Sequence, residues 1–178
     1  AHVVMESFRP GVISRLGFGY DDIRKVNPKV IYCSVSGFGQ TGPYSKRPTV
    51  DGLIQAFSGM MVMNRLPDGT PWRQGMIAVD VTTGLYTFQA IAPALMRQLR
   101  FGEGSYIDSS LMRAAAAYQG AKLMEYVFSK GTPPPLYMPA GSYKTANGYI
   151  MVSAMRPHHF RTLFELACFE GYTQSQLA

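Results

Sequence analysis

The segment KVIYCSVSGFGQTGP, residues 29–43, decides the fold class of this chain. Its first half, Lys29–Ser36, is rich in β-branched and aromatic residues and predicts a buried strand of a parallel sheet. Its second half, Gly37–Pro43, contains three glycines and predicts a loop. We therefore expect an α/β protein in which this strand ends at an irregular loop.

The residues before this segment complete a strand–helix–strand pattern. Val3–Glu6 is expected to end a strand, and Arg9-Pro10-Gly11 forms a turn after it. Short helices are predicted over Val12–Leu16 and Tyr20–Val26. The second has acids in its first turn and bases in its last, which matches the helix dipole, and Asn27-Pro28 ends it. Strands and helices thus alternate at the spacing of a βαβ unit.

The residues after the loop extend the same pattern. Apolar residues at helical intervals predict a helix over Asp51–Met63. Asp80 is expected to head the longest helix, over Val81–Arg100. A strand at Ser105–Asp108 and a helix at Leu111–Ser129 follow. Together these elements predict a partial, Rossmann-like large domain with parallel strands.

A second unit is predicted after the proline linker Gly131–Pro135. Two strands, Gly141–Lys144 and Tyr149–Ala154, are joined at Asn147-Gly148, which is a strong hairpin signal. A helix over Phe160–Phe169 follows. We therefore divide the chain into part of a large α/β domain (residues 1–111), a helix and linker (112–136) and the start of a small α+β domain (137–178).

The composition excludes several classes of protein. With 178 residues, 47% hydrophobic and 12% aromatic, the chain can bury a core, so disorder is excluded. The most apolar window, Gly84–Met96, is too short to cross a bilayer, and no membrane partner is expected. The net charge of +6 favours negative partners, but the longest basic run is Lys46-Arg47, so nucleic acid is not expected.

Cysteine, histidine and glycine patterns give no metal or nucleotide motif. Cys33 and Cys168 have no Cys or His partner at metal-ligand spacing, which predicts reduced thiols, no metal site and a cytoplasmic protein. The glycines after the first strand do not continue into a helix, so a nicotinamide site is not expected. His158 and His159 are expected to be surface or capping residues.

Two aspartates at predicted helix starts are the strongest candidates for chemistry. Asp51 and Asp80 each head an apolar helix and are N-cap candidates, a role that contributes about 1 kcal/mol to stability. The same place suits a nucleophile, because the positive helix end favours the ionised carboxylate and exposes it at the ligand-binding edge of the sheet. The residues alone leave both roles open.

Seven ordered segments resemble those of a known enzyme family. They are Glu6–Gly11, Arg15–Gly17, Asn27–Tyr32, Ser36–Pro43, Gln55–Gly59, Asp80–Tyr86 and Gly102–Asp108. In this order they resemble the class III coenzyme A transferases of the CaiB/BaiF type, a family that includes formyl-CoA transferase, carnitine CoA-transferase and α-methylacyl-CoA racemase. The similarity runs from residue 1 to about Glu170. Because family members are more than twice as long, the chain resembles the central part of one.

The resemblance implies that Asp80 is a covalent nucleophile. Its carboxylate would attack an acyl-CoA thioester to give a mixed anhydride, and the CoA thiolate would return to form an aspartyl-CoA thioester. A carboxylic acid acceptor would then take the CoA. Covalent catalysis divides one difficult exchange into easier steps. Coenzyme A is here a substrate, and no tightly bound cofactor is implied.

The resemblance also implies where CoA binds. The residues that match the family's CoA contacts are Ser7, Phe8, Arg9, Arg15, Leu16, Pro48, Thr49, Val50 and Asp51. Arg15 would pair with a phosphate, and Phe8 would pack on adenine or on the pantetheine arm. Without the family, a solvated helix residue (Arg15), a core aromatic (Phe8) and a turn residue (Arg9) are the simpler interpretations. Asp51 is expected either to shape the acyl pocket or only to cap a helix.

Departures from the family pattern narrow the reaction. The racemase branch has a His immediately before the residue that matches Asp51, and here that residue is Val50, so one proton carrier is missing. Transfer is therefore favoured over racemisation. The glycine run of formyl-CoA transferases is replaced by Leu136–Gly141, which argues against a formyl or oxalyl substrate.

The alternative is a truncated, inactive CoA-binding fragment. The family's first strands and its C-terminal return segment have no counterpart here, and the polar tail Gly171–Ala178 departs from the family pattern. Family subunits interlock like links of a chain, so an interlocked homodimer is implied for the full-length protein. A fragment would expose apolar edges and tend to associate.

Overall fold

The structure is a computed structural model that describes residues 1–66, 68–131 and 139–166. The chain forms two compact units, Ala1–Met124 and Glu125–Ala178, which are described separately. None of the helices within the described ranges is both long enough and apolar enough to cross a membrane.

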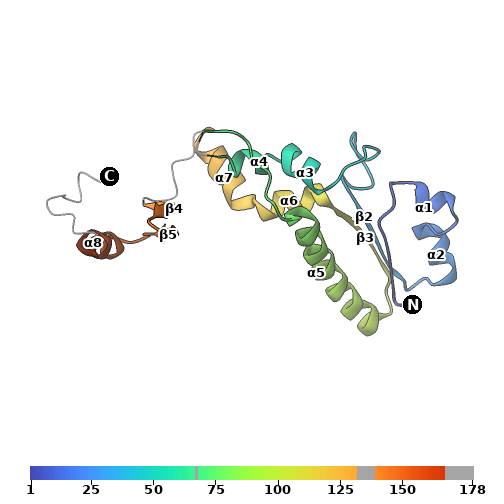
Figure 1. Ribbon diagram of the computed structural model, residues 1–178. Helices are drawn as coiled ribbons and strands as arrows, with labels where there is room; N and C mark the ends of the chain where they lie inside the picture. Colours follow the sequence, from blue (N-terminus) through green and yellow to red (C-terminus); the bar gives the residue numbers. More distant parts are fainter. Residues whose placement is uncertain (67, 132–138, 167–178) are drawn as a thin grey trace. The chain divides into compact units, whose positions relative to one another are not determined.

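A parallel three-stranded sheet forms the centre of the first unit (Figure 1). Its strands are β1 (Val3–Glu6), β2 (Ile31–Ser36) and β3 (Ser105–Ser110), in the order β1-β2-β3. The central strand, β2, lies within the predicted strand Lys29–Ser36, and Ile31, Tyr32 and Cys33 are at most 1% exposed. A strand with neighbours on both edges and cover on both faces needs such an apolar run. The predicted α/β class is confirmed.

Helices surround this sheet. They are α1 (Val12–Arg15), α2 (Tyr20–Val26), α3 (Asp51–Phe57), α4 (Met60–Met63), α5 (Ala78–Phe101), α6 (Leu111–Tyr118) and α7 (Gly120–Phe128), the last of which runs into the second unit. The longest, α5, packs against β2 and β3 as well as against α3 and α6. The connection from β1 to β2 through α1 and α2 gives the predicted βαβ unit.

Two predicted helices are interrupted. The helix expected over Asp51–Met63 is broken at Gly59, whose φ of 82° lies in the left-handed region that glycine adopts without strain. The helix expected over Leu111–Ser129 is divided at Gln119, which ends α6. The longest helix begins at Ala78, three residues before the predicted start at Val81. This last difference changes the interpretation of Asp80.

A small apolar cluster fixes the helix starts near one end of the sheet. Ile54, Val79 and Ala115 have no exposed surface and Met60 is 3% exposed, and they come from α3, α5, α6 and α4. Phe38, Leu111 and Met112 pack against them. Because burial of each such side chain contributes about 1.5–3 kcal/mol, the cluster holds the start of α5 against α3.

The second unit contains the predicted hairpin. Strands β4 (Ala140–Thr145) and β5 (Gly148–Ser153) pair antiparallel, and Thr145 lies opposite Gly148. Helix α8 (Pro157–Leu166) begins three residues before the predicted start at Phe160. Residues 132–135 of the linker, the first residues of Leu136–Gly141, Cys168 and the tail lie outside the described residues. The three-part domain division stays a prediction.

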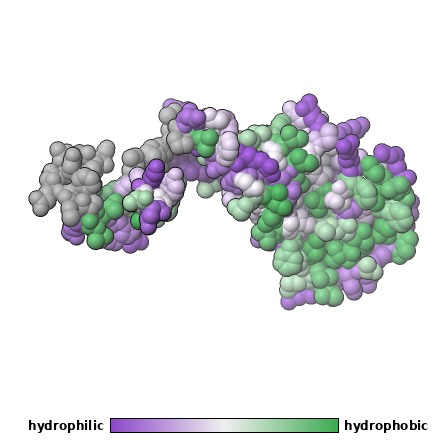
Figure 2. Space-filling view, in the orientation of Figure 1, coloured by the Kyte–Doolittle hydropathy of each residue, from purple (hydrophilic) through white to green (hydrophobic). Residues whose placement is uncertain are grey.

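Large apolar side chains are exposed on the first unit. Figure 2 shows apolar residues gathered over the visible face of this unit. Three of the exposed side chains are Leu85, Phe88 and Phe101 on α5, which are 60–70% exposed. Exposed apolar surface of this extent is typical of a contact surface.

Candidate active site

Asp80 lies in a large cavity beside the sheet. It is the third residue of α5, its side chain is exposed, and the cavity that it lines has a volume of about 860 Å³. The same cavity is lined by Ser7 and Phe8, which follow β1, and by Tyr32 and Val35 of β2. Thr83 and Thr87 extend its wall along α5. The predicted nucleophile and part of the predicted CoA segment are therefore brought together.

Of the two roles left open for Asp80, capping of its own helix is excluded. The N-cap of α5 is Ile77, which has no polar side-chain atom, and Asp80 lies inside the first turn. The free amides at this helix end are instead satisfied by Asp51. The N–H groups of Val79 and Asp80 donate to Asp51 Oδ2 at 2.8 and 3.2 Å. A distant side chain thus does the capping, and the Asp80 carboxylate is left free for other contacts.

Asp51 differs from the prediction in the same way. It is the first residue of α3, whose N-cap is Val50, so it does not cap the helix that it begins. Only 4% of Asp51 is exposed, and its Oδ1 accepts from Gln55 Nε2 at 2.6 Å. Arg73 Nη2 lies 3.7 Å from the same oxygen. Asp51 is not among the described residues that line the large cavity.

The pKa of Asp80 is raised above its ordinary value. Partial burial is the larger cause, and the negative charge of Asp51 adds to it. This direction is opposite to the one expected from the helix end alone. The carboxylate of Asp80 therefore holds its proton to a higher pH than an aspartate in water.

A second cavity adjoins the first and gathers most of the predicted CoA contacts. It has a volume of about 300 Å³ and is lined by Ser7, Phe8 and Arg9 after β1 and by Pro48, Thr49 and Val50 before α3. Ser7 and Phe8 line both cavities. Two segments distant in sequence therefore line one cavity, and Ser7 and Phe8 belong both to this cavity and to the one that holds Asp80.

Arg47 was not among the predicted contacts, yet it lines the second cavity with Ser45. Its guanidinium lies 4.6 Å from the ring centroid of Tyr44, a cation–π contact. The pair Lys46-Arg47 was the available sequence signal, because a basic pair can bind the phosphates of CoA as well as those of a nucleic acid.

Arg15 and Leu16 lie apart from these two cavities. Both are exposed at the end of α1, and neither is among the described residues that line the two cavities. The structure therefore gathers Ser7, Phe8, Arg9, Pro48, Thr49 and Val50 at the second cavity but leaves these two outside.

Sequence reasoning missed the part that Gln55 plays. This side chain is fully buried in α3 and bonds at both ends. Its Oε1 accepts from Gln74 N–H at 2.9 Å, and its Nε2 donates to Asp51 and, at 3.3 Å, to the Met76 carbonyl. The spacing of four residues between Asp51 and Gln55 was the available signal, since such residues face each other on a helix.

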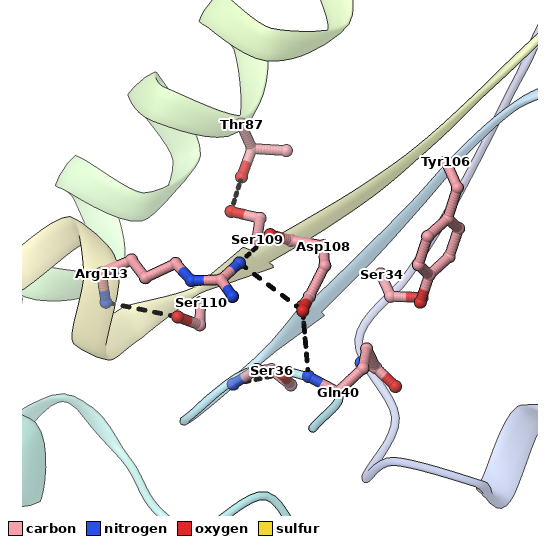
Figure 3. Close-up of polar contacts among 10 residues, drawn as sticks. Ser34, Ser36, Gln40, Thr87, Tyr106, Asp108, Ser109, Ser110 and Arg113 are labelled. Carbon is pink, nitrogen blue, oxygen red and sulfur yellow. Dashed lines mark hydrogen bonds and ion pairs between the residues drawn. The ribbon is translucent and has the colours of Figure 1, made fainter. Parts of the chain in front are cut away.

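A polar cluster holds the loop after β2 against β3 (Figure 3). The Gln40 N–H donates to both carboxylate oxygens of Asp108 at 3.2 Å. Arg113 Nη1 lies 3.5 Å from Asp108 Oδ2 and donates to the Asp108 carbonyl at 2.7 Å. Ser36 Oγ accepts from Gly39 N–H at 3.1 Å, and Gly39 has a φ of 95°. These bonds fix the predicted glycine loop, which connects β2 to the second cavity.

The described residues contain no group of three or more His, Cys, Asp and Glu that could hold a metal ion. His159 Nδ1 accepts from the Met155 N–H at 3.2 Å, and its ring contacts His158 edge to face, so the pair has a local role in the second unit. Burial, with smaller contributions from Glu6 and Asp108, raises the pKa of Cys33 to about 11. A thiol with that pKa is protonated at neutral pH and is a poor nucleophile.

Comparison with known proteins gives consistent results. The family model described as "CoA-transferase family III" matches residues 1–176, which extends past the end of the similarity seen in the sequence. A succinate–glutarate CoA-transferase of Agrobacterium fabrum is 37% identical over 170 residues, which are 92% of this chain and 42% of the relative. An acetyl-CoA:oxalate CoA-transferase of Acetobacter aceti is 36% identical over 173 residues, 93% of this chain and 44% of that protein.

Solved structures agree with the sequence relatives. A CAIB/BAIF family protein from Brucella suis has a TM-score of 0.83 at 33% identity, over 93% of this chain and 46% of that one. The structure of Rv3272 from Mycobacterium tuberculosis has a TM-score of 0.81 at 33% identity, over 93% and 45%. The chain thus spans less than half the length of the relatives that it matches.

Proposed function

This chain belongs to CoA-transferase family III, and from that premise we propose that its full-length protein moves coenzyme A from an acyl-CoA donor to a carboxylic acid acceptor through a covalent thioester on Asp80. One observation carries the proposal. The large cavity that Asp80 lines shares Ser7 and Phe8 with the second cavity, which most of the predicted CoA contacts line. A CoA that lies along Arg9, Pro48, Thr49 and Val50 would bring its thioester toward Asp80.

Each proposed step exchanges one bond for another. An oxygen of the ionised Asp80 attacks the thioester carbonyl and the carbon–sulfur bond breaks. CoA thiolate departs, and a mixed anhydride of Asp80 and the donor acid remains. The thiolate attacks the Asp80 carbonyl carbon, and the donor acid departs with one Asp80 oxygen. The acceptor carboxylate then attacks this thioester and expels the thiolate. Attack of the thiolate on the acceptor carbonyl gives the new acyl-CoA and returns Asp80 as a carboxylate.

The local structure supports Asp80, rather than Asp51, as the reacting carboxylate. Asp51 is 4% exposed and both of its oxygens are occupied, whereas Asp80 is exposed in the large cavity. A nucleophile must reach the substrate within about 3–3.5 Å, which only an accessible side chain can do. The raised pKa of Asp80 also means that its ionised form is less stabilised by its surroundings than an aspartate in water.

We propose small carboxylic acids as the donor and acceptor class. The relatives' names include succinate, glutarate and oxalate, and the oxalate name weakens the expectation against an oxalyl substrate. These relatives are named as transferases, which favours transfer over the racemase-type alternative. Val50, which stands where racemases have a His, lines the second cavity with an apolar side chain that cannot carry a proton. Arg15 and Leu16 remain proposed CoA contacts, at a part of the ligand beyond the two cavities.

The interlocked homodimer remains a prediction for the full-length protein. Sedimentation of that protein at micromolar concentration is expected to give a single dimeric species. A transfer-competent monomer would contradict this part of the proposal. The same preparation, compared with the 178-residue chain alone, would test the alternative of an inactive CoA-binding fragment.

Covalent trapping tests the proposed function. The full-length protein is incubated with acyl-CoA, treated with hydroxylamine, digested, and analysed by mass spectrometry. We expect an aspartyl hydroxamate at Asp80 and an unchanged peptide around Asp51. An unmodified Asp80 in a protein that turns over would contradict the proposal.

A further inference from the structure

We propose that Gln55 is a positioning residue for Asp80, acting through the Asp51 carboxylate and the backbone that precedes α5. This inference rests on the proposed function, because it concerns the placement of the nucleophile. Gln55 is not among the described residues that line the large cavity. Its effect on Asp80 would therefore be transmitted through other groups.

The first connection is to the segment before α5. Gln55 Oε1 accepts from the Gln74 N–H at 2.9 Å, and Gln55 Nε2 donates to the Met76 carbonyl at 3.3 Å. One buried amide thus binds two backbone positions within the residues that lead into Asp80. Exposure is high along this segment: Met76 is 75% and Ile77 is 53% exposed, so side-chain packing alone holds it weakly.

The second connection orients the capping carboxylate. Gln55 Nε2 donates to Asp51 Oδ1 at 2.6 Å, which leaves Oδ2 for the Val79 and Asp80 amides. The other partner of Oδ1 is Arg73, at 3.7 Å and with a half-exposed side chain, so its hold on the carboxylate is weakened by solvent. Without Gln55, Oδ1 loses its short hydrogen bond, and the orientation of the carboxylate toward the helix end is held less firmly.

The Asp80 amide is itself one of the two donors to Asp51, so a shift of this cap moves the backbone of the nucleophile. Displacement of a reacting group by about 1 Å can reduce a rate about 100-fold. The proposed CoA contacts at the second cavity are different residues, after β1 and before α3. A positioning role therefore predicts a loss in kcat with little change in the KM for acyl-CoA.

The test compares two buried glutamines in the full-length protein. Gln55→Met keeps the volume of the side chain and removes its hydrogen bonds. Gln98→Met is the matched control, because Gln98 is 7% exposed, bonds to His2 and the Lys29 carbonyl, and lies near the other end of α5. We expect Gln55→Met to slow kcat and the formation of the Asp80 thioester about 100-fold. We expect Gln98→Met to lose similar stability and to keep its rate.

Amide hydrogen exchange supplies a second readout. Exchange at Val79 and Asp80 should become faster in Gln55→Met and stay unchanged in Gln98→Met. Gln55→Leu also removes the hydrogen bonds to Gln74, Met76 and Asp51 and introduces no charge. We expect it to be as slow as Gln55→Met, and it carries the same comparison if Gln55→Met does not fold.

The outcomes separate the two proposals. A wild-type protein that turns over without label at Asp80 would overturn the proposed function. A wild-type protein labelled at Asp80, with Gln55 variants labelled equally fast, would overturn the positioning role alone. Equal losses of kcat in Gln55→Met and Gln98→Met would also overturn it, since the effect would then follow from stability.

Discussion

Two aspartates stand in the first turns of two neighbouring helices, and their surroundings could hardly differ more. At the start of α3, Asp51 is buried and bonded to Gln55 and to the first amides of another helix. At the start of α5, Asp80 is exposed in a large cavity. The local sequence allows the same two roles, helix capping and chemistry, for both aspartates. Tertiary partners decide between them, because capping by one carboxylate leaves the other available for chemistry.

Substitution at Asp80 should have the largest effect on activity. In Asp80→Asn the proposed nucleophile is removed, and we expect kcat for CoA transfer to fall by about 10⁴-fold or more. Since Asp80 caps no helix, the free energy of unfolding should change by only about 0.5 kcal/mol. Steady-state kinetics and urea denaturation of the full-length protein measure both. If Asp80→Asn keeps its transfer activity, Asp80 is not the nucleophile and the proposed difference between the two aspartates is wrong.

Substitution at Asp51 should combine a stability loss with a smaller activity loss. Asp51→Ala leaves the amides of Val79 and Asp80 and the Gln55 donor without their buried acceptor. We expect the free energy of unfolding to fall by about 2 kcal/mol. We expect kcat to fall about 100-fold through misplacement of Asp80. If thermal denaturation finds Asp51→Ala as stable as wild type, the capping role is wrong.

Two arginines extend the comparison to CoA binding. Arg9 lines the second cavity, whereas Arg15 lies outside both cavities. Loss of one charge-assisted hydrogen bond to a phosphate weakens binding by about 1.5–3 kcal/mol, so Arg9→Ala should raise the KM for acyl-CoA at least about 10-fold. Arg15→Ala should raise it less. The reverse order, measured at one ionic strength, would mean that the phosphate contact predicted for Arg15 contributes more to CoA binding than Arg9 does.

A pH profile gives the smallest expected effect. Because the pKa of Asp80 is raised, first by burial and then by Asp51, transfer should decline on acidification at a higher pH than for an ordinary aspartate. Asp51→Asn removes the negative charge and keeps one acceptor oxygen. Its acidic limb of kcat/KM should shift to lower pH, without reaching the ordinary value, since burial remains. An unmoved limb would mean that Asp51 does not act on Asp80 electrostatically.

The sequence predicted the sheet well and the carboxylate network poorly, for identifiable reasons. The apolar run Lys29–Ser36 could be recognised as a central strand because a strand that is buried on both faces consists of consecutive apolar residues. The break at Gly59 was missed, since a glycine within an apolar helical pattern need not interrupt it.

Helix capping was assigned to the wrong residues because capping was judged from the nearest sequence. Asp51 caps a helix that begins 27 residues further along, at Ala78, and no local pattern reports such a pairing. Gln55 was missed for the same reason, since only the folded chain brings Gln74 and Met76 to it. Asp80 itself came from the family resemblance together with its place at a helix start.

The most direct test of the difference between the two aspartates uses an acceptor acid labelled with oxygen-18 in its carboxylate. After many turnovers with acyl-CoA, the full-length protein is digested and its peptides are weighed by mass spectrometry. Attack by the acceptor on an Asp80 thioester must leave one acceptor oxygen in the Asp80 side chain, so we predict label in the Asp80 peptide and none in the Asp51 peptide. Label at Asp51, or turnover with no label in either peptide, would contradict the account.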